Sequence, residues 1–358
     1  MTRHHRVLTA AARAIGAPGL QLVEVIREGT RADVLRAAEG DRTVVIKAHH
    51  DPNGTWRHEA AGLDTAHGLG SPELLGVSHD LPVLVMRDLG GGESLADRLL
   101  GKDPQAAEEG LLGWARGLAD LHAGTSGRYD VHTARLAQLG STTGLPEHLS
   151  LHRGLAEVDR LTLEHGLPRM ATLHEAWTGL TAPLQQPEHW VLSPGDACPD
   201  NNLITSAGVR LLDFEFAEFR HPAWDVAYLR VPWPSCWCAW ALPVPIADRG
   251  CATYRGAVSS ALPWVGGPEF DDALGRATLA FCLATAGWFL GNALAGGQAG
   301  GDDGTEHRPG RRTMILSRLA VAATSPADDE LAAYAGALAA ALTRRWGAHP
   351  LAMAPAFA

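Results

Sequence analysis

The chain has 358 residues, of which 46% are hydrophobic and 20% charged, and its formal net charge is −10. This length suffices for two lobes around a substantial core, and so much apolar content excludes a largely disordered chain. Because 40 Asp and Glu residues outnumber 30 Lys and Arg residues, the composition argues against a general nucleic-acid or anionic-membrane binder. Five scattered cysteines do not form the pattern of a disulfide scaffold, so we expect a cytoplasmic protein. We expect it to be either a monomer or a homodimer.

The first part of the chain has the apolar pattern of β-strands. Short apolar runs are separated by turn residues such as Glu-Gly-Asp at 39–41, which is a hairpin signal. One segment with helical periodicity precedes the last two strands. The predicted elements are, in chain order, strands at 20–27, 32–37 and 43–47, a helix at 55–67, and strands at 73–77 and 82–86.

The composition changes after the fifth predicted strand. Three glycines at 90–92 predict a hinge, so we expect one lobe over 1–89 and a second, larger lobe over 90–358. The second lobe is mainly helical, and one strand pair at 202–205 and 209–214 interrupts it. The predicted helices are 94–100, 104–122, 150–165, 172–183, 246–258, 270–295, 311–322 and 327–346. The fold class is therefore α+β, with a small antiparallel sheet lobe and a larger helical lobe.

The most apolar stretch of the chain is 277–295. It contains the polar residues Thr278, Thr285 and Asn292 and lacks aromatic or basic anchors on both sides. We therefore predict a buried helix of the larger lobe, and we expect no membrane partner.

Three side chains with oxygen ligands lie around the predicted strand pair. Asp196 is followed five residues later by Asn201, and Asp213 stands at the end of the second strand. In phosphoryl transfer from ATP, one carboxylate accepts or orients the proton of the attacking hydroxyl, while a carboxylate and an amide oxygen hold Mg²⁺. The pattern predicts this chemistry.

This region resembles the aminoglycoside phosphotransferase and choline kinase family, which consists of small-molecule kinases with a bilobal, protein-kinase-like fold. The resemblance covers roughly residues 20 to 230, and the combined set of motifs is more specific than any one of them. The matching segments are Val44-Val-Ile-Lys47, Arg57-His-Glu59, Leu118-Ala-Asp-Leu-His122, Gly195-Asp196 with Asn201, Leu211-Leu-Asp-Phe214 and His221-Pro-Ala-Trp-Asp-Val-Ala-Tyr228.

The resemblance implies a role for each matching polar residue. Asp196 would be the catalytic carboxylate, and Asn201 and Asp213 would bind Mg²⁺. Lys47 would contact the α- and β-phosphates of ATP and pair with Glu59. One further carboxylate, that of Asp225, would be buried and would tether the catalytic loop. The other residues expected around the nucleotide are Gly29, Thr30, Met86 and Asp88.

Two positions depart from the family pattern. The family usually has His two residues before the catalytic Asp, and this chain has Pro194 there. The turn expected to cover the phosphates, residues 27–31, has one glycine instead of a glycine-rich series. Both departures favour a second hypothesis, a nucleotide-binding regulatory or scaffold protein of the same fold with impaired catalysis.

The segment 231–243 is rich in Trp, Cys and Pro, and it follows the proposed active-site strand. Its tryptophans either form an aromatic wall for a substrate or pack against the helical lobe. Zinc binding by Cys236 and Cys238 is disfavoured because no second ligand pair follows at suitable spacing. The candidate substrate residues are Glu215, Trp233, Trp237 and Trp240.

The sequence thus predicts an ATP- and Mg²⁺-dependent phosphotransferase that moves the γ-phosphate to a hydroxyl of a small molecule. The acceptor stays open among antibiotics, sugars, nucleosides and amino alcohols. A protein kinase is disfavoured, since only eleven residues separate Asp213 from Asp225 and no Ala-Pro-Glu sequence follows.

Overall fold

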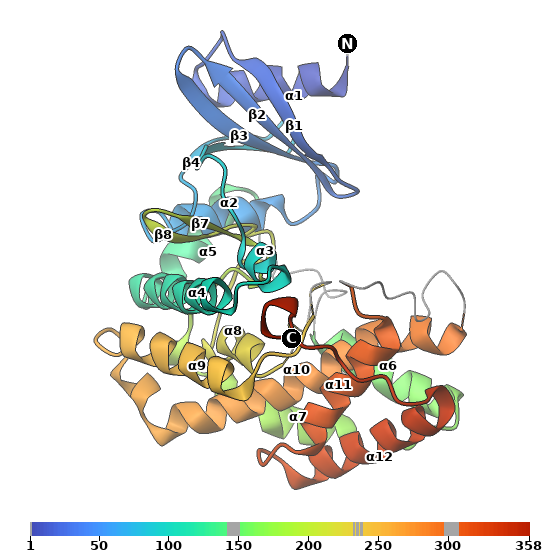
Figure 1. Cartoon of the computed structure of the whole chain (residues 1–358). Helices are drawn as coiled ribbons and strands as arrows, with labels where there is room; N and C mark the ends of the chain where they lie inside the picture. Colours follow the sequence, from blue (N-terminus) through green and yellow to red (C-terminus); the bar gives the residue numbers. More distant parts are fainter. Residues whose placement is uncertain (1, 142–150, 232, 234–235, 237–238, 297–307) are drawn as a thin grey trace.

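The computed structural model describes residues 2–141, 151–231, 233, 236, 239–296 and 308–358. An antiparallel sheet forms one end of the molecule, and helices form most of the other end (Figure 1). The predicted α+β class is confirmed. The sheet contains, in the order β1-β2-β3-β5-β4, the strands β1 (Gln21–Glu28), β2 (Ala32–Glu39), β3 (Arg42–His49), β5 (Val83–Arg87) and β4 (Leu74–Ser78).

Helix α1 (Arg3–Ile15) covers the sheet. Its side chains Val7 and Ala11 are buried in a small core with apolar residues of β2, β3 and β5. The side-chain oxygen of Thr2 caps the helix by accepting from the backbone N–H of His5 at 3.3 Å. This core holds β3 in the middle of the sheet, and Lys47 lies near the end of that strand.

Helix α2 (Trp56–Thr65) belongs to the core of the larger part of the molecule. A Cβ atom on Gly62 would lie 2.6 Å from the Cβ of Ala217, so the helix backbone approaches the segment after Asp213 very closely. Glycine normally weakens a helix, but here any side chain would push the two segments apart. This contact brings Glu59, which is on α2, next to Asp213. The proposed lobe boundary at residue 89 stays a prediction.

The helices of the larger part follow the predicted pattern, with two additions. Sequence periodicity did not predict α5 or the short α8, since α5 buries only His132 and α8 has four residues. The helices are α3 (Leu95–Leu100), α4 (Pro104–Thr125), α5 (Tyr129–Gln138), α6 (Leu151–Glu164), α7 (Leu173–Thr181), α8 (Ala223–Val226), α9 (Val244–Val258), α10 (Pro268–Ala295), α11 (Arg311–Ala323) and α12 (Asp329–Trp346).

Helix α10 contains the apolar stretch 277–295. By length and composition alone it could cross a membrane, but 72% of its most apolar window is buried inside the protein. It packs against α6, α8 and α11. The helix is therefore a core helix, as predicted.

Two small antiparallel sheets position the central loops. The predicted strand pair is β7 (Asn202–Thr205) with β8 (Gly208–Leu211), and the second pair, which was not predicted, is β6 (Val191–Ser193) with β9 (Glu218–Arg220). Strand β8 ends before the predicted residue 214. Asp213 has a φ of 60°, a left-handed conformation in which a strand cannot continue.

Candidate active site

A buried lysine connects the sheet to the strand end that carries Asp213. Lys47 Nζ donates to Glu59 Oε1 at 2.9 Å and to Asp213 Oδ1 at 2.6 Å. Burial alone lowers the pKa of Lys47, but the charges of these two carboxylates outweigh it and raise the pKa above its ordinary value. Burial likewise raises the pKa of Glu59, and Lys47 and His49 reverse this and lower it to about 2. Lys47 and Glu59 are therefore a charged ion pair at neutral pH.

Asn201 and Asp213 lie at the same end of the β7–β8 hairpin. The backbone N–H of Leu212 donates to the carbonyl of Asn201 at 2.9 Å, so Asn201 is directly across from the residue before Asp213. An amide oxygen and a carboxylate are hard ligands of the kind that Mg²⁺ prefers. The strained backbone of Asp213 turns this residue out of the strand, which is common where a side chain has a functional position. The donor set fits a magnesium ion.

Asp196 follows a glycine that the local backbone requires. Gly195 has a φ of 83°, and a Cβ atom there would lie 2.0 Å from the carbonyl oxygen of Phe216. Further along the loop, Asn201 Nδ2 donates to the carbonyl oxygen of Asp196 at 3.0 Å and contacts its Oδ2 at 3.3 Å. The loop therefore closes on itself between the proposed catalytic and metal-binding residues.

Asp225 is completely buried beneath this loop. It accepts hydrogen bonds from Ser193 Oγ at 2.7 Å, from His122 Nε2 at 3.1 Å and from Arg220. Burial raises its pKa, but the neighbouring Arg220 and His122 dominate and lower it to about 2. Ser193 Oγ in turn accepts from the backbone N–H of Gly195 at 2.9 Å. Asp225 thus contacts the loop through the Ser193 hydroxyl, one residue before Pro194.

The neighbouring His221 should make the fold sensitive to acid. Its Nδ1 accepts from the backbone N–H of Ala223 at 3.1 Å, and burial, with the nearby His189 and His122, lowers its pKa to about 3. Between this value and about 6.5 the unfolded chain binds a proton that the folded chain does not. Stability should therefore fall as the pH drops below about 6.5, by at most about 1.4 kcal/mol per pH unit from this group.

Urea unfolding between pH 4.5 and 7.5 measures this effect. The variant His221→Asn, which keeps a hydrogen-bond acceptor near the Ala223 N–H, should reduce the slope of stability against pH by about one proton. The control His67→Asn removes an exposed histidine and should leave the slope unchanged. An unchanged slope in His221→Asn would contradict the assignment.

The residues expected around the nucleotide lie along the sheet. Gly29 is in the β1–β2 turn, where a Cβ atom would lie 2.7 Å from the carbonyl oxygen of Ala32, and the next residue, Thr30, is exposed. Met86 is buried in β5, and Asp88 accepts from Arg36 Nε at 2.8 Å. Their contacts with a nucleotide stay a prediction.

Glu215 is buried between two cations. Its carboxylate forms an ion pair with Arg31 at 2.7 Å and lies 3.9 Å from Lys47 Nζ. Burial and the charge of Asp213 raise its pKa above the ordinary value. Glu215 is therefore part of the charged cluster around Lys47, and its predicted contact with a substrate stays untested.

Two of the three tryptophans proposed as substrate residues are in the core. Trp233 and Trp240 are 0% and 2% exposed, and the ring of Trp233 makes an edge contact with that of Trp114 at 5.9 Å between centroids. Trp237 lies outside the described residues. For Trp233 and Trp240, the structure agrees with the packing alternative.

A cavity of about 970 Å³ opens beside Asp196. Its charged lining consists of three arginines, Arg31, Arg153 and Arg220, and three carboxylates, those of Asp196, Glu157 and Glu218. Sequence reasoning missed its aromatic residues, because they are spread over more than one hundred positions and share no local pattern. They include Trp177, Trp190, Phe216, Trp224, Tyr228, Phe281 and Trp288.

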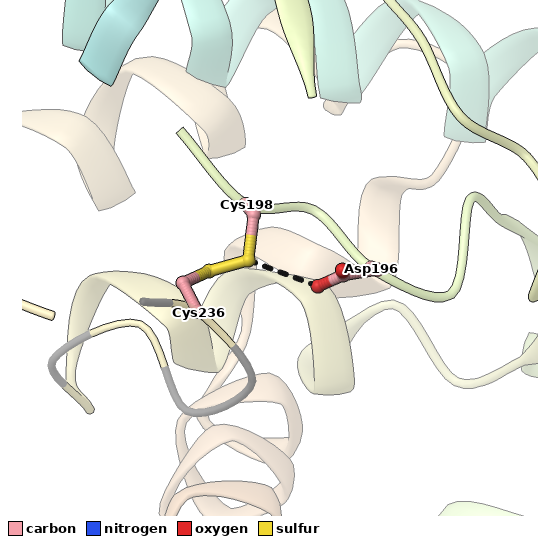
Figure 2. Close-up of side chains that lie close together, drawn as sticks. All are labelled: Asp196, Cys198 and Cys236. Carbon is pink, nitrogen blue, oxygen red and sulfur yellow. Dashed lines mark hydrogen bonds between the residues drawn. A yellow bond between two sulfur atoms is a disulfide. The ribbon is translucent and has the colours of Figure 1, made fainter. Parts of the chain in front are cut away.

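The structure also contains a disulfide that was not predicted. Cys198, in the loop after Asp196, is bonded to Cys236, and their Cα atoms are 5.9 Å apart (Figure 2). The Cys198 sulfur lies 3.0 Å from Asp196 Oδ1. An odd number of scattered cysteines gave no indication of this pair, because the two residues are 38 positions apart. Cys238, the other residue considered for zinc, lies outside the described residues.

The chain is similar in structure to several solved small-molecule kinases. A choline/ethanolamine kinase family protein from Mesorhizobium loti is 16% identical with a TM-score of 0.54, and the match covers 95% of this chain and 100% of that one. A putative aminoglycoside phosphotransferase from Ralstonia eutropha is 16% identical with a TM-score of 0.53, and the coverages are 93% and 98%. For an ethanolamine kinase from Plasmodium vivax these values are 12%, 0.51, 86% and 83%.

These likenesses show the fold, and they confirm the predicted kinase-like architecture. No curated protein matches the chain in sequence. A sequence model of the phosphotransferase enzyme family matches residues 23–257. Because this match spans more than half of the chain, the protein belongs to the phosphotransferase enzyme family, and the predicted family resemblance and enzyme class are confirmed.

Proposed function

We propose that the protein is an ATP- and Mg²⁺-dependent phosphotransferase that phosphorylates a hydroxyl of a small molecule. The observation that carries this proposal is the contact of Lys47 with both Glu59 and Asp213, beside the loop that holds Asp196. Residues from three separate parts of the chain meet there, and each matches a role that phosphoryl transfer requires.

Each group has a distinct task in this proposal. Lys47, held in position by Glu59, contacts the phosphates of ATP as a fixed cation. Asn201 and Asp213 would hold Mg²⁺, which neutralises charge on the phosphates when it is bound. Asp196 accepts or orients the proton of the acceptor hydroxyl, and it lies at the cavity where an acceptor fits.

The cavity lining favours an acceptor with a flat or apolar part. The described lining has equal numbers of arginines and carboxylates, so it carries no net negative charge that would attract a polycationic acceptor. Its aromatic side chains suit a ring or a glycoside. The solved relatives are named for choline, ethanolamine and aminoglycosides, which all carry hydroxyl groups, so we infer a hydroxyl acceptor here too.

The second hypothesis, a nucleotide-binding protein with impaired catalysis, rests on Pro194 and the sparse glycine turn. The Ser193 hydroxyl and Asp225 hold the loop on the N-terminal side of Pro194, so the missing histidine does not leave the loop unsupported. We therefore favour the active enzyme. Its location in the cytoplasm and its lack of nucleic-acid partners stay predictions from composition.

A phosphorylation screen tests the proposal. We expect ADP formation with Mg²⁺ and ATP to rise with a nucleoside, sugar or aromatic glycoside, and less with polyamines such as aminoglycosides. Excess EDTA should abolish the reaction, and mass spectrometry should find the product heavier by one phosphate. Binding of ATP without turnover on any acceptor, and without slow hydrolysis, would instead support the impaired protein.

A further inference from the structure

We propose that Cys198 and Cys236 form a reversible thiol–disulfide site that controls the turnover of the enzyme. This inference rests on the proposed function, because it concerns the loop that carries Asp196. Figure 2 shows the disulfide directly beside the Asp196 carboxylate. Oxidation or reduction of the sulfur therefore changes the environment of the proposed catalytic residue.

The sulfur of Cys198 is a neighbour of the catalytic carboxylate. It lies 3.0 Å from Asp196 Oδ1, and the Tyr228 hydroxyl lies 3.5 Å from the same oxygen. In the thiol form, the S–H group donates a hydrogen bond to this carboxylate oxygen. In the disulfide form, the sulfur has no proton and cannot donate. Oxidation therefore removes one of the hydrogen bonds that orient Asp196.

The partner cysteine is anchored to a buried residue of the core. The backbone N–H of Cys236 donates to the carbonyl of Trp233 at 3.1 Å, and Trp233 is fully buried against Trp114 of α4 and Tyr228. A disulfide to Cys236 therefore ties the loop of residues 196–201 to the helical core. Because phosphoryl transfer depends on positioning, a restraint two residues from Asp196 should affect the rate.

The cysteine separation also fits a disulfide. The Cα distance of 5.9 Å is within the usual range, so the bond forms without a large backbone movement. Of the other three cysteines, Cys251 and Cys282 are buried and form no disulfide, and Cys238 lies outside the described residues. Burial raises the pKa of Cys282 to about 12, so it is a poor nucleophile at neutral pH. Burial also raises the pKa of Cys251, so neither of these two described thiols should compete with Cys198 and Cys236 for oxidation.

A hydroperoxide is the proposed oxidant. Both cysteines are 3% exposed, so the oxidant must be small. Hydrogen peroxide is little larger than a water molecule and is small enough to enter the cavity of about 970 Å³ at Asp196. The Cys198 thiolate attacks one peroxide oxygen, which breaks the O–O bond and gives a sulfenic acid and water. The Cys236 thiolate then attacks the Cys198 sulfur and releases a second water. In sum, two thiols and one peroxide give one disulfide and two waters, and a dithiol reverses the change.

The test compares turnover in the two redox states of the full chain. Protein treated with hydrogen peroxide, followed by catalase, should have a kcat about fivefold or more below that of protein kept in dithiothreitol. The KM for ATP should change less than about twofold, since the Cys198 sulfur contacts Asp196, whereas Lys47 is held by Glu59 and Asp213. Alkylation and peptide mass spectrometry should find the two thiols linked only in the oxidised sample. Dithiothreitol should restore kcat.

Two variants serve as controls. Cys236→Ala keeps the Cys198 thiol but cannot form the disulfide, so its kcat in dithiothreitol should match that of the reduced protein, and mass spectrometry after peroxide should find no linked pair. Cys251→Ala should keep the full response to peroxide. If the pair is linked and kcat is unchanged, or if the reduced protein unfolds, the proposed redox regulation is wrong. Either result leaves the proposed phosphotransferase function standing. Absence of any turnover in the reduced protein counts against the proposed function, and mass spectrometry still reports whether the pair forms.

Discussion

Replacement of Asp196 by asparagine should lower the rate of phosphoryl transfer by about 10²- to 10⁴-fold. The amide keeps the shape of the side chain and cannot accept a proton from the acceptor hydroxyl. Asp196 lies at the cavity and does not belong to the charged cluster around Lys47. The affinity for ATP should therefore stay within about twofold of the unchanged protein, and isothermal calorimetry with Mg²⁺ and ATP measures this separately from turnover.

The control for this experiment is Asp120→Asn, which changes an exposed carboxylate on α4 in the same way. It should leave kcat and ATP affinity unchanged. If Asp196→Asn turned over acceptor at the normal rate, its catalytic role would be wrong, even if the nucleotide site were correct. If it lost ATP binding as well, the residue would belong to the nucleotide site instead.

Replacement of Lys47 by methionine should lower kcat/KM for ATP by about 10²- to 10³-fold. Methionine fills a similar volume but removes the cation that contacts Glu59 and Asp213. The variant should also be about 3–5 kcal/mol less stable, because Glu59 is left buried with its main counter-charge missing. Initial rates over a range of ATP concentrations, with urea unfolding on the same samples, separate the two effects.

A double variant separates the effect of the lost charge on activity from its effect on stability. The double variant Lys47→Met with Glu59→Gln removes both members of the ion pair, so it should recover part of the stability but none of the activity. The control Lys102→Met changes an exposed lysine and should affect neither quantity. Full activity in either variant at Lys47 would refute its role at the phosphates.

The convergence of the charged residues could be predicted because each has a local signal. Lys47 follows apolar residues of a strand, Glu59 lies on the next helix, and Asp213 comes just after another apolar strand. These segments carry the family resemblance, and the resemblance implied the roles of all three residues. Local patterns do not give the exact end of β8, where the left-handed backbone of Asp213 stops the strand early. They also do not predict α5, because its few buried positions leave no clear apolar face.

Contacts between distant parts of the chain lie beyond such patterns. The aromatic lining of the cavity comes from α7, α8, α10 and the segments between them, and each residue alone looks like an ordinary core residue. The tryptophans near residue 233 are close together in sequence, and this clustering suggested a substrate-binding wall. The two described ones, Trp233 and Trp240, pack in the core. The pairing of Cys198 with Cys236 likewise depends on how the loops meet.

The buried position of Lys47 has a practical consequence for labelling. The chain contains only two lysines, Lys47 and Lys102. The first is held in an ion-paired core, and the second is exposed at the start of the segment that leads into α4. Once the terminal amine is blocked, an amine-directed dye therefore has a single accessible attachment point. A uniformly labelled protein for fluorescence or surface immobilisation needs no engineered cysteine, which leaves the native thiol chemistry intact.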